Sequence, residues 1–152
     1  MIAFIPTGSF GWIHHRFLNR LDWLEALATH AGKRRGYVDL AEGDVCWFRD
    51  NGSYVAYMHH PKLLSPPSAD EAQRRIESGE FPLLKDVLND RFAHIPFVVE
   101  LKTGHGPEEE AIPAIVEMLE HSRPGNYWID SFSPRQLALV KKTAPTALTS
   151  LH

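Results

Sequence analysis

The chain has 152 residues, of which 43% are hydrophobic and 23% are charged, and this balance predicts one globular domain with its own core over residues 1–152. The net charge is −3 at pH 7, so composition gives no reason to expect binding to nucleic acid. No apolar run approaches the roughly 20 residues of a membrane-spanning helix, so we expect no stable insertion into a membrane. The single cysteine, Cys46, leaves no partner for a disulfide within the sequence and suits a reducing compartment, which predicts a cytoplasmic protein.

Strand-like segments recur along the sequence. They are rich in β-branched and aromatic residues, and turn signals separate them. The opening residues, IAFIP, have no clear assignment. The predicted strands cover residues 12–15, 36–48, 51–60, 95–102, 127–132 and 146–151.

Helix-like segments lie between most of these strands. The predicted helices cover residues 21–32, 65–75, 82–91, 107–122 and 134–144. Ser68 or Asp70 is the expected N-cap of the second helix, and Pro82 opens the third. Strands that are separated by helices of this length form a largely parallel sheet, which occurs in doubly wound folds and in barrels. The pattern alone leaves both architectures open.

Ionisable residues stand near the C-terminal ends of four consecutive predicted strands. Side chains alternate along a strand, so two residues at positions i and i+2 point to the same face. Parallel α/β folds place their functional sites at the carboxyl ends of the strands, and we therefore expect these side chains to meet. In chain order they are His14 and His15, Glu42 and Asp44, His59 and His60, and Glu100 and Lys102.

This combination of residue types favours a metal and phosphate site. The carboxylates of Glu42, Asp44 and Glu100 would repel one another unless a cation neutralised them, and oxygen ligands favour a hard divalent ion such as Mg²⁺ or Ca²⁺. Lys102 suits an anionic substrate, a phosphate above all. Two histidines on different strands would serve as general base and general acid.

Each of these features alone also fits an ordinary surface strand, and only their recurrence in register favours a site. A zinc site made of the four histidines is a further alternative. Zinc prefers nitrogen and sulfur ligands, but adjacent histidines on one strand point to opposite faces, so few of them would converge.

Five motifs of the sequence also stand in a characteristic order. They are HHR (14–16), LAEGDVCWFRDNGSYVAYMHHPKLL (40–64), FPLLKDVL (81–88), IPFVVELK (95–102) and IDSFSPRQL (129–137). In this order the chain resembles the glycerophosphodiester phosphodiesterases, whose pattern runs His-Arg-Gly, Glu-x-Asp-Val, a second histidine after an Asp-Gly turn, a Pro-x-Leu helix, Glu-x-Lys and Ser-Phe. No single motif is specific, but the ordered set is, and it spans nearly the whole chain.

The resemblance implies a fold. It implies an α/β barrel of the (β/α)8 TIM type, which normally takes about 250 residues. This chain supplies about six of the βα units and lacks the last strands, so the barrel is expected to be incomplete. An open sheet exposes unpaired edges, and the chain is therefore expected to form a homo-oligomer that completes or covers the barrel.

The resemblance also implies a reaction. The chain is similar to enzymes that hydrolyse phosphoric diesters with a divalent metal, here held by Glu42, Asp44 and Glu100. The substrate would be a small glycerophosphodiester or a lysophospholipid-like molecule, cleaved to an alcohol and a phosphomonoester or a cyclic phosphate. A non-catalytic protein that binds phosphodiesters or a partner through a truncated barrel is the alternative.

The resemblance assigns four further residues. Lys102 and Arg16 would contact the phosphate. The acid–base histidines would be His15, with His14 as the alternative, and His59, with His60 as the alternative.

The sequence departs from the family pattern at two places. Phe17 replaces the glycine of His-Arg-Gly, and either His60 or Pro61 replaces the aspartate after the second histidine. In both respects the chain looks like the divergent branch that includes spider-venom phospholipase D. The departures bear on the substrate more than on the chemistry.

Overall fold

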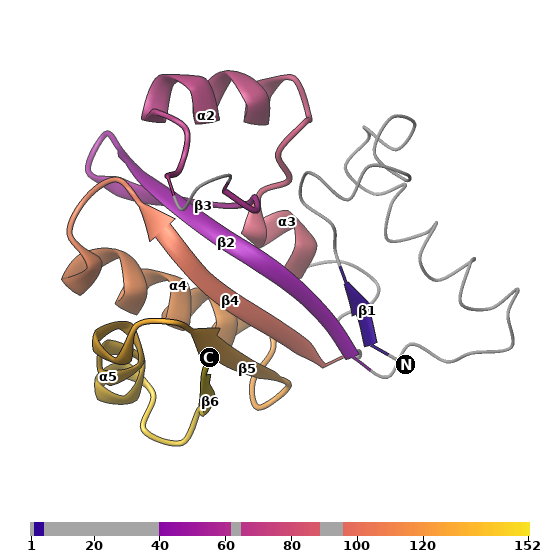
Figure 1. The fold of residues 1–152 in the computed structure, drawn as a ribbon, viewed down its shortest axis with the longest axis vertical. Coiled ribbons are helices and arrows are strands. Elements are labelled where there is room, and N and C mark those ends of the chain that lie inside the picture. Colours follow the sequence, from indigo (N-terminus) through magenta and orange to yellow (C-terminus); the bar gives the residue numbers. More distant parts are fainter. Residues whose placement is uncertain (1, 5–39, 62–64, 89–95) are drawn as a thin grey trace, which may run out of the picture.

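The computed structural model describes residues 2–4, 40–61, 65–88 and 96–152 of the chain. These residues form a six-stranded sheet with helices packed against it (Figure 1). The strands are β1 (Ile2–Phe4), β2 (Leu40–Asp50), β3 (Ser53–Met58), β4 (Phe97–Gly104), β5 (Tyr127–Ser131) and β6 (Leu148–Leu151). The order across the sheet is β1-β2-β4-β5-β6, and all neighbours on this path are parallel. The predicted parallel sheet is therefore confirmed for these strands.

The helices follow the predicted segments closely. They are α2 (Ala69–Glu77), α3 (Leu84–Leu88), α4 (Glu108–Ser122) and α5 (Pro134–Thr143). Ser68 is the N-cap of α2, because its side chain accepts a hydrogen bond from the amide of Glu71, and this settles the choice between the two predicted caps. The strand predicted at 12–15 and the helix predicted at 21–32 lie outside the described residues.

One face of the sheet packs against α3, α4 and α5. Alternate strand residues point into this layer, and Val45, Val99 and Ile129 are fully buried there. They meet an apolar stripe of α4 that includes Ile112 and Leu119. Burial of each such side chain stabilises the fold by about 1.5–3 kcal/mol, so these helices hold the parallel strands in register.

The strand β3 runs antiparallel to β2, so the parallel arrangement expected for the strands does not extend to this one. The turn between β2 and β3 is too short for a crossover. Asn51 and Gly52 have φ angles of 46° and 86°, which is the type I′ geometry of a two-residue hairpin. The end of β3 therefore returns to the middle of β2, where Met58 pairs with Val45.

The face of the sheet opposite α4 and α5 carries its residues in layers. Val98, Trp128 and Leu148 are register partners on β4, β5 and β6 and form an apolar layer. Two residues further along the strands lie Glu100, Asp130 and Ser150, which form a polar layer.

Parallel strands whose inward side chains stack in layers are the architecture of a (β/α) barrel of the TIM type. The barrel is incomplete in this chain: among the described strands, β6 pairs only with β5.

Candidate functional site

Three carboxylates stand side by side across neighbouring parallel strands. Asp44 on β2 is the register partner of Glu100 on β4, and Glu100 is the register partner of Asp130 on β5. Neighbouring strands lie about 4.8 Å apart, so their charges interact strongly. Asp44 and Glu100 were predicted to meet, and they do.

Lys102 joins the first two of these carboxylates. Its Nζ lies 2.9 Å from Oδ1 of Asp44 and also contacts Oε1 of Glu100. Burial acts to lower the pKa of Lys102, but the two carboxylates more than offset it, and the pKa is raised. The lysine is therefore held as a cation inside the cluster.

Glu42 belongs to the same cluster, one layer further toward the start of β2. Its pKa is raised, first by partial burial and then by the negative charges of Glu100, Asp44 and Asp130. Burial also raises the pKa of Glu100, and Asp44 acts in the same direction, while Lys102 opposes both. Four carboxylates thus share a region with fewer positive charges than negative ones, which is an environment that attracts a further cation.

The cluster does not have the spacing of a metal site in its present arrangement. Within residues 2–4, 40–61, 65–88 and 96–152, no three Asp, Glu, His or Cys side chains are placed so that they could hold one ion. The Lys102 ammonium is bonded to two of the three predicted ligands. Occupation by a divalent ion would therefore require Lys102 to release at least one carboxylate.

His59 lies beside Asp44 because of the hairpin. Its amide donates a hydrogen bond to the Asp44 carbonyl at 3.0 Å, and its ring packs 4.5 Å from the ring of Phe81. Burial lowers the pKa of His59 to about 4, and Arg75 acts in the same direction. The imidazole is therefore neutral at pH 7. The alternative, His60, is exposed.

His15 and Arg16, together with the alternative His14, lie outside the described residues. Their predicted roles stay predictions.

The prediction missed three polar residues in this region. Asp130 is buried and is the register partner of Glu100. It directly precedes the Ser-Phe motif of the sequence. His152 bonds to Asp130 through its ring, and only the β5–β6 register reveals this pairing. Gln136 at the start of α5 is buried and donates to the Lys102 carbonyl at 2.9 Å. A glutamine in the first turn of a helix gives no sequence signal for such burial.

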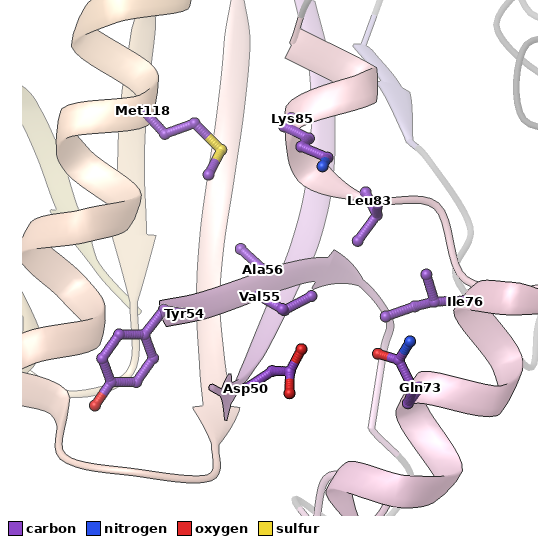
Figure 2. A pocket seen from close by; sticks show the side chains of 9 residues that line it. All are labelled: Asp50, Tyr54, Val55, Ala56, Gln73, Ile76, Leu83, Lys85 and Met118. Atoms are coloured by element: carbon purple, nitrogen blue, oxygen red, sulfur yellow. The ribbon is translucent and has the colours of Figure 1, made fainter. Parts of the chain in front are cut away.

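A separate cavity of about 240 Å³ lies beside the hairpin and not at the carboxylate cluster (Figure 2). None of the predicted site residues that the structure describes lines it. The lining side chains come from β2, β3, α2, α3 and α4 and from the segment before α3: Asp50, Tyr54, Val55, Ala56, Gln73, Ile76, Leu83, Lys85 and Met118.

None of the helices in the described part of the chain is both long and apolar enough to cross a bilayer.

The layered parallel strands are those of an α/β barrel, and the acidic layer lies near the carboxyl ends of β5 and β6, at the edge where barrels of this type carry their sites. Three solved structures share this fold. One is an Oleispira antarctica phosphodiesterase in complex with the product sn-glycerol-3-phosphate, with 22% identity and a TM-score of 0.61, covering 97% of this chain and 63% of the other.

The second is a glycerophosphodiester phosphodiesterase from Parabacteroides distasonis, with 18% identity and a TM-score of 0.60, covering 86% of this chain and 56% of the other. The third, from Silicibacter pomeroyi, is described as a glycerophosphoryl diester phosphodiesterase, with 18% identity and a TM-score of 0.61, covering 88% and 59%.

The resemblance found in the sequence motifs is therefore confirmed for the fold. The chain spans between 56% and 63% of the length of these three structures. No family model matches the sequence, and no curated protein matches it either.

Proposed function

We propose that the chain acts as a phosphoric diester hydrolase that depends on a divalent metal and cleaves a small glycerophosphodiester or a lysophospholipid-like substrate. One observation carries the proposal: Lys102 is held as a cation between Asp44 and Glu100, at the carboxyl ends of parallel strands. The shared fold with solved phosphodiesterases supports the same reaction class.

Glu42, Asp44 and Glu100 are the proposed ligands of Mg²⁺ or Ca²⁺. Their donor type fits such an ion, because all three offer carboxylate oxygens, and the raised pKa of Glu42 records the excess negative charge. When bound, the ion supplies polarisation of a non-bridging phosphate oxygen. Lys102 then contacts the phosphate through its ammonium group, which in the present structure bridges the carboxylates of Asp44 and Glu100. Arg16 adds a second cationic contact.

Two histidines, His15 and His59, carry the proposed proton transfers. Hydrolysis requires that a proton leave the attacking oxygen and that another reach the leaving alcohol. His59 is neutral at pH 7 because its pKa is about 4, so it enters the reaction able to accept a proton. A substrate hydroxyl in place of water would give a cyclic phosphate instead of a phosphomonoester.

Activity of the purified chain on glycerophosphodiesters and lysophospholipids with added Mg²⁺ or Ca²⁺ tests this proposal. We expect turnover that chelation abolishes and that falls by about 10²–10⁴-fold in His59→Ala. His121→Ala, at an exposed histidine of α4, is the matched control and should keep full activity. An active His15→Ala/His59→Ala double variant would contradict the assignment.

The alternative is a non-catalytic protein that binds a phosphodiester. Two observations favour it: the described residues lack metal-site spacing, and the chain spans about 60% of the related structures. The same assay separates the two functions. Saturable binding of a diester without turnover under any metal supports the alternative.

We further propose that the chain self-associates in the cytoplasm through the β6 edge. Leu148 and Leu151 on this edge are 65% and 57% exposed. Among the described strands β6 pairs only with β5, and such an apolar edge favours pairing with another chain. The solution mass should exceed that of one chain at micromolar concentration. Leu151→Lys should lower it, whereas a monomer at every concentration would contradict the proposal.

A further inference from the structure

A third histidine faces the carboxylate cluster from the opposite side to His59. The amide of His152 donates to the Ser131 carbonyl at 3.1 Å, so pairing between β5 and β6 continues through this residue. Because side chains alternate along a strand, His152 shares a face with Ser150, the register partner of Asp130. The backbone thus places the imidazole in the layer directly above the carboxylates.

Asp130 holds this imidazole in one orientation. Asp130 is 5% exposed, and its Oδ2 lies 3.1 Å from Nε2 of His152. The hydroxyl of Ser150 donates to the other carboxylate oxygen, Oδ1. A carboxylate on one ring nitrogen of a histidine fixes the ring and leaves the other nitrogen to exchange a proton with a substrate. Here the remaining nitrogen is Nδ1, on a side chain that is 46% exposed.

Phe132 links His152 to the proposed phosphate contact. Its ring centroid lies 5.3 Å from the ring of His152 and 5.5 Å from the Lys102 ammonium. Phe132 is 66% exposed and the side chain of His152 is 46% exposed, so both face solvent beside the largely buried ammonium of Lys102.

We propose that His152, positioned by Asp130, is a catalytic residue that protonates the leaving-group oxygen of the phosphodiester. This inference rests on the proposed function but assigns the protonation of the leaving alcohol to His152, which leaves acceptance of the proton from the attacking oxygen to His15 or His59. The attacking water forms a bond to phosphorus and gives one proton to the accepting histidine. The bond between phosphorus and the leaving oxygen breaks, its electron pair stays on that oxygen, and the oxygen takes the Nδ1 proton of His152. The products are an alcohol and a phosphomonoester, and solvent restores both histidines.

A residue that donates a proton to the leaving group can be recognised because the effect of removing it depends on which leaving group the substrate carries. An alkoxide needs a proton as it leaves, whereas p-nitrophenolate does not. The experiment compares the full chain and its variants, with Mg²⁺ present, on two glycerol phosphodiesters that differ only in the second alcohol, ethanol or p-nitrophenol. We expect His152→Ala to lower kcat/KM for the ethyl diester by about 10²–10⁴-fold and for the p-nitrophenyl diester by less than about 10-fold.

Two further variants sharpen the result. Asp130→Asn keeps the shape of the side chain and should give a smaller loss with the same preference for the p-nitrophenyl diester, which a merely structural role would not produce. His121→Ala, an exposed histidine on α4, should change neither rate.

Equal losses on both diesters in His152→Ala, or no loss on either, would overturn the role of His152 and leave the proposed function standing. If the unsubstituted chain cleaves neither these diesters nor a lysophospholipid, the proposed function falls and the role of His152 falls with it.

Discussion

The Lys102 ammonium lies 2.9 Å from the carboxylate of Asp44 on the neighbouring strand, and it also contacts Glu100 on its own strand. The same two carboxylates are proposed to hold a divalent ion. On that proposal, lysine and metal would compete for these oxygens until a substrate phosphate drew the lysine away. This competition can be measured.

Lys102→Met removes the competitor. Without metal the variant should be less stable than the parent chain, because Asp44 and Glu100 lose their cationic partner. Addition of Mg²⁺ or Ca²⁺ should raise its Tm by more than it raises that of the parent. Lys142→Met, at an exposed position of α5, is the control and should respond to metal as the parent does. Equal metal responses in all three proteins would argue against shared ligands.

Glu42→Gln should separate stability from function. The raised pKa of Glu42 shows that burial and the neighbouring carboxylates disfavour its charge, so a neutral side chain should increase the stability of the metal-free protein. The same change removes a proposed ligand and should weaken metal-dependent turnover. Urea unfolding and activity assays on one preparation test both effects. The exposed Glu117 of α4 offers the control Glu117→Gln, and a loss of metal-free stability in Glu42→Gln would contradict the prediction.

His59 should make stability depend on pH. The pKa of His59 is about 4 in the folded chain, whereas an unperturbed histidine has a pKa of 6.5. Between these values the unfolded chain binds a proton that the folded chain does not, so stability is complete above pH 6.5 and falls as the pH drops toward 4. His59→Phe keeps an aromatic ring against Phe81 but cannot titrate. The difference in unfolding free energy between the two proteins should therefore slope between pH 4 and 6.5, and a flat difference would refute the burial of a neutral imidazole.

Gln136→Leu should destabilise the fold around the site. Gln136 donates to the Lys102 carbonyl at 2.9 Å and accepts from the Ser131 hydroxyl at 2.5 Å. Leucine removes both hydrogen bonds from buried groups, at a cost of about 1–3 kcal/mol. Gln73→Leu on α2 replaces a glutamine that bonds only to Glu77 at the surface, and it should change stability by less than about 0.5 kcal/mol. Similar midpoints of urea unfolding for the two variants would count against the network.

Local signals in the sequence were sufficient for most elements of the fold. The apolar run before Glu100 predicted β4, and the helix-like segments 107–122 and 134–144 predicted α4 and α5, because such features act within one or two turns of chain. The alternation of side chains likewise predicted that Glu100 and Lys102 share a face. The direction of β3 was not predicted, although Asn-Gly between two strand-like segments is typical of a two-residue hairpin turn.

The site was predicted where it depends on spacing within a strand and missed where it depends on register between strands. Asp130 meets His152 only because β5 and β6 pair in one register, and a one-residue slip would turn either side chain to the other face. The bridge from Lys102 to Asp44 depends in the same way on the pairing of β2 with β4. Such registers are set by the packing of the helices and not by any short motif.

The position of His59 depends on the strand register at the base of the β2–β3 hairpin and not on the length of the hairpin. Because Val45 faces Met58 in an antiparallel ladder, matched insertions in both arms would lengthen the hairpin without moving the imidazole away from Asp44. A loop inserted at the Asn51-Gly52 turn should therefore be able to bind another molecule while the proposed reacting groups keep their positions.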